Sequence, residues 1–92
     1  MTTKQKNKIK PSKSDVKKSQ EMFIVLYNDD VNTFDFVIET LVDICNHLPE
    51  QAEQCALITH FKGKCDVKKG NLEFLKPLKD SLISKGLSAV IE

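Results

Sequence analysis

The fold is decided at residues 24–34, which read Ile-Val-Leu-Tyr-Asn-Asp-Asp-Val-Asn-Thr-Phe. The apolar run over residues 22–27, which ends at Tyr27, is typical of a strand. The Asn-Asp-Asp of residues 28–30 then favours a sharp bend, because these side chains bond nearby backbone groups. A helix follows, with Asn32 or Thr33 as its cap. Three oxygen-rich side chains at one bend could serve the turn alone, or they could bind a cation.

Two helices are predicted after the bend. The first has apolar residues at helical spacing, which predict a buried stripe: Phe34, Val37, Ile38, Leu41, Ile44, Cys45 and Leu48. The second runs over residues 49–62, because Pro49 suits a first helical position and Gly63 is a usual stop. One face of it has only small residues, which permit a close neighbour or a groove: Ala52, Cys55, Ala56 and Thr59.

The rest of the chain alternates between strand and helix patterns. Cys65 and Val67 alternate with Lys64, Asp66 and Lys68, so they predict a short edge strand with one buried face. We expect the last helix to begin at Pro77 and to end at Gly86. A helix that is capped at Asn71 would be broken by Pro77, because proline removes a backbone donor in its second turn. The expected helix would bury Leu78, Leu82 and Ile83, and residues 87–92 would form the final strand.

This element order, β-α-α-β-α-β, predicts an α+β sandwich. Its small three-stranded antiparallel sheet would be covered on one face by helices. Residues 21–92 would form this single domain. Residues 1–20 hold seven Lys and one Asp with few apolar residues, so they are expected to be a disordered lysine-rich tail.

The charge is distributed unevenly between these two parts. The tail is basic, whereas residues 21–92 carry seven Lys against twelve acidic residues. A basic arm could touch nucleic acid, but this tail has no Arg and no aromatic residue, and the domain behind it repels phosphate. We therefore expect no nucleic-acid partner.

The composition also indicates the cellular compartment and the state of the cysteines. No apolar run is long enough to span a membrane and no signal peptide is recognisable, so a cytoplasmic protein without a membrane partner is expected. The odd number of cysteines, Cys45, Cys55 and Cys65, argues against a disulfide framework or a zinc ribbon. These cysteines are interpreted as reduced core thiols.

Catalytic and metal-binding interpretations have little support from spacing. A cysteine hydrolase would pair one of the three thiols with His47 or His60, but Cys55 and His60 point about 140° apart around a helix. A metal site formed by Cys55, His60, Cys65 and Asp66 has no known ligand spacing. We expect no enzyme activity, no metal and no cofactor.

Three segments together resemble the ClpS family of Clp protease adaptors. They are Tyr-Asn-Asp-Asp at residues 27–30, Phe-Val-Ile-Glu at 36–39 and His-Phe-Lys-Gly-Lys at 60–64, and the resemblance covers residues 22–69. It implies a non-enzymatic adaptor that recognises a destabilising N-terminal residue, an N-degron, on a substrate protein. The adaptor would deliver that substrate to a Clp-family AAA+ ATPase that is ClpA- or ClpC-like.

The resemblance also implies a two-part binding site. By similarity, the substrate's N-terminal amine is bound by Asn28, Asp30 and His60, while Asp29 supports the loop or binds through water. A hydrophobic pocket would receive the first side chain, and its lining residues are Asn32, Phe34, Val37, Ala56, Thr59 and Leu87. The family usually has Thr-Pro-Met at residues 32–34 and Met and Val in place of Ala56 and Thr59, so the pocket is reshaped.

One alternative comes from another class of protein. The same sandwich occurs in the C-terminal domain of the ribosomal stalk protein, in which case residues 28–30 would only turn the chain and cap the helix. On either interpretation a monomer is expected. In the adaptor interpretation, the lysine-rich tail engages the ATPase during hand-over.

Overall fold

The computed structural model of the chain describes residues 21–92, so the tail predicted at residues 1–20 lies outside the described residues. The elements are β1 (Met22–Tyr27), α2 (Phe34–Cys45), α3 (Pro49–Lys62), β2 (Lys64–Gly70), α4 (Leu72–Ser84) and β3 (Ser88–Ile91). Their order is the predicted one, and the α+β class is confirmed.

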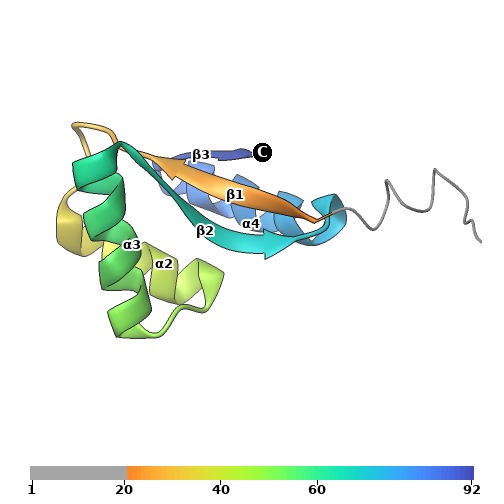
Figure 1. Cartoon of the computed structure of the whole chain (residues 1–92), viewed down its shortest axis with the longest axis horizontal. Helices are drawn as coiled ribbons and strands as arrows, with labels where there is room; N and C mark the ends of the chain where they lie inside the picture. Colours follow the sequence, from red (N-terminus) through yellow and green to blue (C-terminus); the bar gives the residue numbers. More distant parts are fainter. Residues whose placement is uncertain (1–20) are drawn as a thin grey trace, which may run out of the picture.

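The three strands form an antiparallel sheet in the order β2-β1-β3. Strand β1 is therefore central and β2 lies at an edge, as predicted. Figure 1 shows α4 running behind the strands, with α2 and α3 packed together below them. Within residues 21–92, no helix is long and apolar enough to cross a membrane.

One apolar core joins the inner face of the sheet to all three helices. Ile24 and Leu26 of β1 contribute from the sheet, Leu41 from α2, and Leu75 and Leu82 from α4. Burying each of these side chains stabilises the fold by about 1.5–3 kcal/mol. The small face predicted on α3 is confirmed, since all four of its members are buried: Ala52, Cys55, Ala56 and Thr59.

Two apolar residues expected in the buried stripe of α2 lie outside the core. Phe34 leaves 39% of its surface exposed and Leu48 leaves 69%. Helix α2 ends at Cys45 because Asn46 adopts a left-handed conformation, with φ 63°, that turns the chain away. Leu48 therefore lies outside α2 and directly precedes α3.

Helix α4 begins at Leu72, so the start predicted at Pro77 is wrong. Asn71 caps the helix, since its Oδ1 accepts a hydrogen bond of 2.8 Å from the Phe74 N–H. A proline inside a helix costs about 3 kcal/mol. Complete burial of Leu75 contributes about 1.5–3 kcal/mol and the cap about 1 kcal/mol, which together offset that cost.

Two side chains lie on a different face from the predicted one. Ile83 of α4 is half exposed, whereas Leu82 is fully buried as expected. Lys68 was expected on the exposed face of β2, but a bulge leaves Val67 without a partner on β1 and turns Lys68 inward. Lys68 is half-buried, and its Nζ donates to the Cys45 carbonyl at 2.8 Å.

Candidate functional site

The bend after β1 is built around the carboxylate of Asp29. Its Oδ1 accepts hydrogen bonds of 2.9 Å from the backbone N–H groups of Val31 and Asn32, and its Oδ2 accepts one of 3.0 Å from Asn32 Nδ2. These are the local bonds by which an aspartate specifies a turn. Thr33 then caps α2, since its Oγ1 accepts from the Phe36 N–H at 3.1 Å.

The hydrogen bonds to Asp29 also set its protonation. Partial burial opposes ionisation, but the donors of Asn32 and Val31 outweigh it, so the pKa of Asp29 is lowered from its ordinary 3.8. Asp29 is therefore an ionised structural group. Both of its oxygens are already engaged within the bend.

Asn32 ties the bend to a distant turn. Its Nδ2 donates a second hydrogen bond of 2.9 Å to the carbonyl of Gly86, which has φ 94° in the turn between α4 and β3. Leu87 follows directly and is buried. The amide of Asn32 thus fixes one edge of the site, and both hydrogens of its Nδ2 are engaged within the protein.

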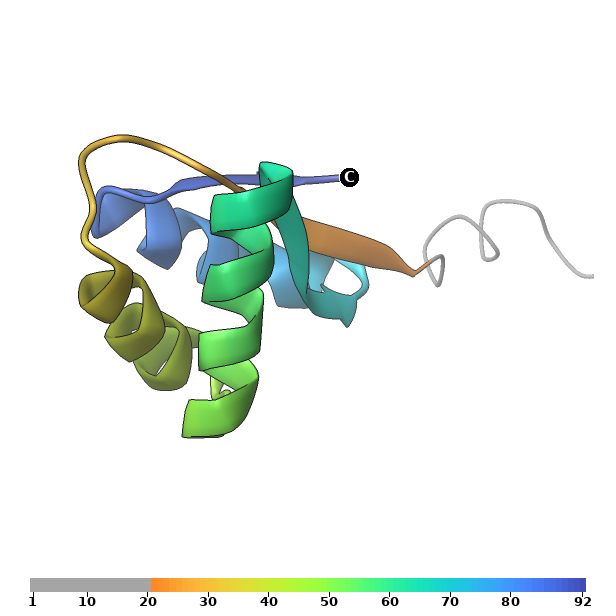
Figure 2. The ribbon, with the colours of Figure 1, turned by 60° about the vertical axis from the view of Figure 1, so that its left-hand side comes forward.

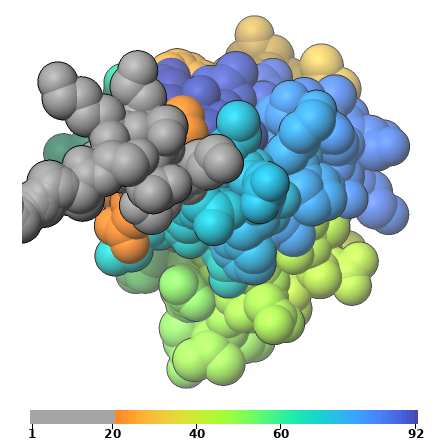
Figure 3. Space-filling view, turned by 90° about the vertical axis from the view of Figure 1, so that its right-hand side faces the viewer, coloured from red at the N-terminus to blue at the C-terminus, as the bar shows by residue number. Residues whose placement is uncertain are grey.

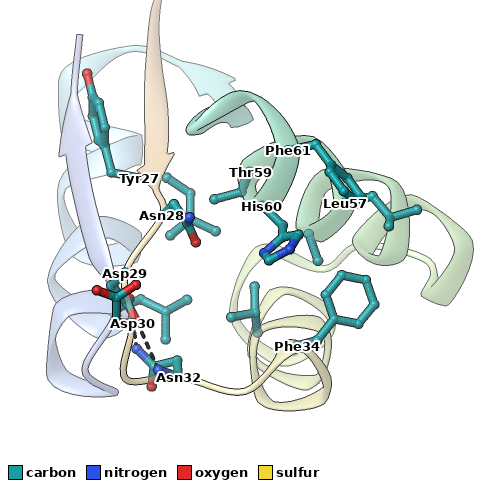
Figure 4. Close-up of a pocket in the computed structure, with 14 residues that line it drawn as sticks. Tyr27, Asn28, Asp29, Asp30, Asn32, Phe34, Leu57, Thr59, His60 and Phe61 are labelled. Carbon is teal, nitrogen blue, oxygen red and sulfur yellow. Dashed lines mark hydrogen bonds between the residues drawn. The ribbon is translucent and has the colours of Figure 1, made fainter.

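The C-terminal end of α3 is held against the same bend. The Asn28 N–H donates to the Gly63 carbonyl at 2.9 Å, and Gly63 is the left-handed residue that ends α3. His60 lies in the last turn of α3 and is brought close to Asn28 although the two are distant in the sequence (Figure 4). Figure 2 shows the bend arching from β1 to α2 at this end of the molecule.

The side chains of Asn28, Asp30 and His60 are exposed at the site. Within residues 21–92, no hydrogen bond or ion pair occupies the Asn28 amide, the Asp30 carboxylate or the His60 ring. Each has an oxygen or a ring nitrogen that can accept a hydrogen bond. The structure therefore brings these three acceptors together without using them.

An apolar pocket of about 550 Å³ opens beside these acceptors. Its inner wall is formed by residues that are buried or half-buried: Leu26, Val37, Ala56, Thr59 and Leu87. The Thr59 hydroxyl donates to the Cys55 carbonyl at 2.8 Å, so its single hydrogen is engaged within α3. Every site residue expected from the sequence lines this pocket: Asn28, Asp29, Asp30, Asn32, Phe34, Val37, Ala56, Thr59, His60 and Leu87.

Four further lining residues were not expected from the sequence: Leu26, Tyr27, Leu57 and Phe61. Leu57 and Phe61 lie one helical turn apart on α3, beside Ala56 and His60. That spacing places them on the same side of the helix and could have indicated them. Tyr27 is directed elsewhere, since its hydroxyl donates to the Glu92 carboxylate, which raises the pKa of Tyr27.

The cysteines and His47 have surroundings that favour structural roles. Burial raises the pKa of Cys45 and of Cys55, and burial together with the nearby Cys55 thiol raises the pKa of Cys65 to about 12. Thiols that stay protonated are poor nucleophiles. His47 is buried, with Nε2 donating to the Val67 carbonyl at 2.6 Å, and it joins the α2–α3 connection to β2.

Metal binding finds no better support in the described part of the chain. Residues 21–92 contain no group of three or more His, Cys, Asp or Glu side chains placed to hold a metal ion. What the pocket offers is a set of neutral and anionic acceptors beside an apolar cavity. That combination suits a ligand with a cationic donor group and an apolar body.

Comparison with known proteins shows that this chain matches one protein family. Its sequence model, described as "ATP-dependent Clp protease adaptor protein ClpS", matches residues 17–89. The ATP-dependent Clp protease adapter protein ClpS of Campylobacter jejuni is 48% identical over 40 residues, which cover 44% of this chain and 42% of that protein. The protein of the same name from Acetivibrio thermocellus is 36% identical over 55 residues, covering 60% of this chain and 56% of the relative. The chain thus matches about half the length of these curated relatives.

A solved structure shares the fold. It is that of Agrobacterium tumefaciens ClpS2 bound to L-phenylalaninamide, with a TM-score of 0.70. The alignment covers 80% of this chain and 96% of that one at 19% sequence identity. At this identity the likeness concerns the arrangement of strands and helices.

Proposed function

Because the chain belongs to the ClpS family of Clp protease adaptors, we propose that it binds substrate proteins by a bulky hydrophobic N-terminal residue, an N-degron. The bound substrate is then delivered to a Clp-family AAA+ ATPase, ClpA- or ClpC-like, for degradation. The adaptor acts as a cytoplasmic monomer without cofactor and without catalytic activity. The family membership also favours this role over that of a ribosomal stalk domain.

One observation carries the proposal: three side chains with unoccupied acceptors, those of Asn28, Asp30 and His60, line the same apolar pocket. A free N-terminus is an ammonium group with three donors, so it needs several acceptors that point to one place. The Asn28 amide oxygen, the Asp30 carboxylate and a neutral His60 nitrogen supply them. Charge-assisted hydrogen bonds of this kind are stronger than neutral ones.

The first side chain of the substrate fits the apolar part of the pocket. Ala56 and Thr59 are small, so the wall formed by α3 stands back and leaves space for a large side chain such as Leu, Phe, Tyr or Trp. The ligand named for the Agrobacterium ClpS2 structure, L-phenylalaninamide, carries a free amine and a phenyl ring. We propose that ligands of the same chemistry bind here.

Asp29 and Asn32 have supporting roles in this proposal. The hydrogen bonds between them hold the bend in shape, so that Asn28 and Asp30 face the ligand. Asn32 also fixes the turn that precedes Leu87. The lysine-rich residues 1–20 engage the ATPase during hand-over, as their charge suits an acidic protein surface.

Substitution of the acceptors tests the proposal. We expect Asn28→Ala, Asp30→Asn and His60→Ala each to weaken binding of a peptide that starts with Leu by about ten- to a hundredfold, since a hydrogen bond to a charged group contributes about 1.5–3 kcal/mol. Calorimetric titration of the full chain measures the affinity. Asp80→Asn is the matched control, because Asp80 is an exposed carboxylate of α4 that does not line the pocket. Unchanged affinity in all three site variants would refute the proposal.

A further inference from the structure

Three apolar side chains form an outer cluster at the mouth of the pocket. This rim cluster consists of Phe34 at the start of α2 and of Leu57 and Phe61 on α3. Phe34 is 39% exposed and Phe61 is 76% exposed, whereas Ala56 on the inner wall is 3% exposed. Leu57 is half-buried, so the rim cluster as a whole is more open to solvent than the deep wall of the same pocket.

The rim cluster lies beyond His60 when viewed from the bend. In Figure 4, Asn28 and Asp30 are on one side of the His60 ring, and Phe34, Leu57 and Phe61 are on the other. The rings of His60 and Phe61 meet edge to face, with centroids 4.8 Å apart. A ligand bound to His60 thus lies beside Phe61 of the rim cluster.

Single exposed apolar residues are ordinary on protein surfaces, but here two exposed phenylalanines and the half-buried Leu57 line one pocket from two helices. The pocket volume of about 550 Å³ is also larger than one amino-acid side chain. A single N-terminal side chain therefore does not fill it. The pocket has room for a longer stretch of the bound chain.

We propose that the rim cluster binds the third residue of the substrate and favours an apolar side chain there. This inference rests on the proposed function, because it takes the first amine as anchored at Asn28, Asp30 and His60. The chain that leaves this anchor is extended, and successive side chains of an extended chain point to opposite sides. The third side chain returns to the protein face about 6.6 Å further on, while the second points to solvent.

Peptides that differ at one position test the assignment. The probes are Leu-Ala-Ala, Leu-Leu-Ala and Leu-Ala-Leu on a common C-terminal sequence, together with acetylated Leu-Ala-Leu, each titrated against the full chain. We expect Leu-Ala-Leu to bind about three- to tenfold more tightly than Leu-Ala-Ala, since partial burial of one Leu is converted to affinity. Leu-Leu-Ala should bind like Leu-Ala-Ala.

Phe61→Ala identifies the surface that is responsible. We expect this variant to lose the advantage of Leu-Ala-Leu over Leu-Ala-Ala. The readout is the ratio of the affinities for Leu-Ala-Leu and Leu-Ala-Ala. Phe61 contacts His60, but a change at His60 would weaken both peptides equally and so leaves this ratio unchanged. Phe74→Ala is the matched control: Phe74 is 49% exposed and does not line the pocket. It lies in the first turn of α4. The end of the molecule where β2 meets α4 faces the viewer in Figure 3.

The outcomes separate this inference from the proposed function. If the free peptides bind more tightly than the acetylated one but a third-position Leu gives no advantage, the rim-cluster assignment is overturned and the amine site stands. An advantage at position two, or one that persists in Phe61→Ala, also overturns the assignment. Equal binding of free and acetylated peptides, or no binding at all, overturns both.

Discussion

At the scale of single residues, Asp29 and Asp30 are neighbours in one bend with different surroundings. Asp29 accepts three hydrogen bonds from Val31 and Asn32, and these lower its pKa. The Asp30 carboxylate is exposed and accepts none from the described residues. Asp29 therefore stabilises the bend, and we propose that Asp30 binds the ligand.

This difference predicts how stability depends on pH. A carboxylate whose pKa is lowered in the folded state stabilises the fold above its ordinary pKa, which is 3.8 for Asp29, and this stabilisation is lost as the pH falls through the folded value. We expect Asp29→Asn to reduce the unfolding free energy at pH 7 by about 1 kcal/mol. The gap to the unmodified chain should shrink as the pH falls below about 4. Urea unfolding at a series of pH values measures it.

Asp30→Asn is the control in the same bend. It should leave the unfolding free energy at pH 7 nearly unchanged, because the Asp30 carboxylate accepts no hydrogen bond from the described residues, while it weakens peptide binding. A gap for Asp29→Asn that stays constant into the acid range, or an equal gap for Asp30→Asn, would contradict the assignment of the two residues.

At the scale of the elements, the connection between β2 and α4 decides where the last helix starts. Asn71 satisfies the Phe74 N–H at the first turn, and Leu75 enters the core from that turn. The later Pro77 is accommodated inside the helix. The first turn is therefore held by its cap and by burial, against the local preference of the proline.

Removal of the cap should destabilise the whole domain. We expect Asn71→Ala to lower the unfolding free energy by about 1 kcal/mol, and Asn71→Asp to retain most of it, because Asp also accepts at a cap and complements the positive helix end. Thermal or urea unfolding distinguishes the two variants. Equal stability of Asn71→Ala and the unmodified chain would show that the core alone fixes the start of α4.

The elements also mark what the sequence could and could not predict. Strand β1 and helix α3 were predicted with the correct bounds. The apolar run of β1 ends in the turn residues 28–30, and α3 lies between the start signal of Pro49 and the stop signal of Gly63. The start of α4 was missed since burial of Leu75 depends on tertiary packing. The bulge at Val67, which turns Lys68 inward, likewise has no signal in a local pattern.

At the scale of the whole molecule, the fold brings three distant segments to one end. The bend after β1, the last turn of α3 and the turn before β3 are joined by the hydrogen bonds from Asn28 to Gly63 and from Asn32 to Gly86. The rest of the domain is an ordinary core that fixes these segments in place. The pocket is therefore a property of the complete fold.

This convergence limits how far the site could be predicted. Residues 28–30 and His60 could be named from the sequence, and they do lie at one pocket. The engagement of Asp29 and Asn32 with each other, and the position of Leu57 and Phe61 at the mouth, depend on how the segments meet. Such contacts have no counterpart in the spacing of residues along the chain.

The central claim is that this pocket binds a free N-terminal amine next to a large apolar side chain. The most direct test is calorimetric titration of the full chain with one peptide that begins with Leu, in its free form and in its N-acetylated form. We predict saturable binding of the free peptide and at least about tenfold weaker binding of the acetylated one, because acetylation removes the charge and two of the three donors. Equal affinity for the two peptides would contradict the claim.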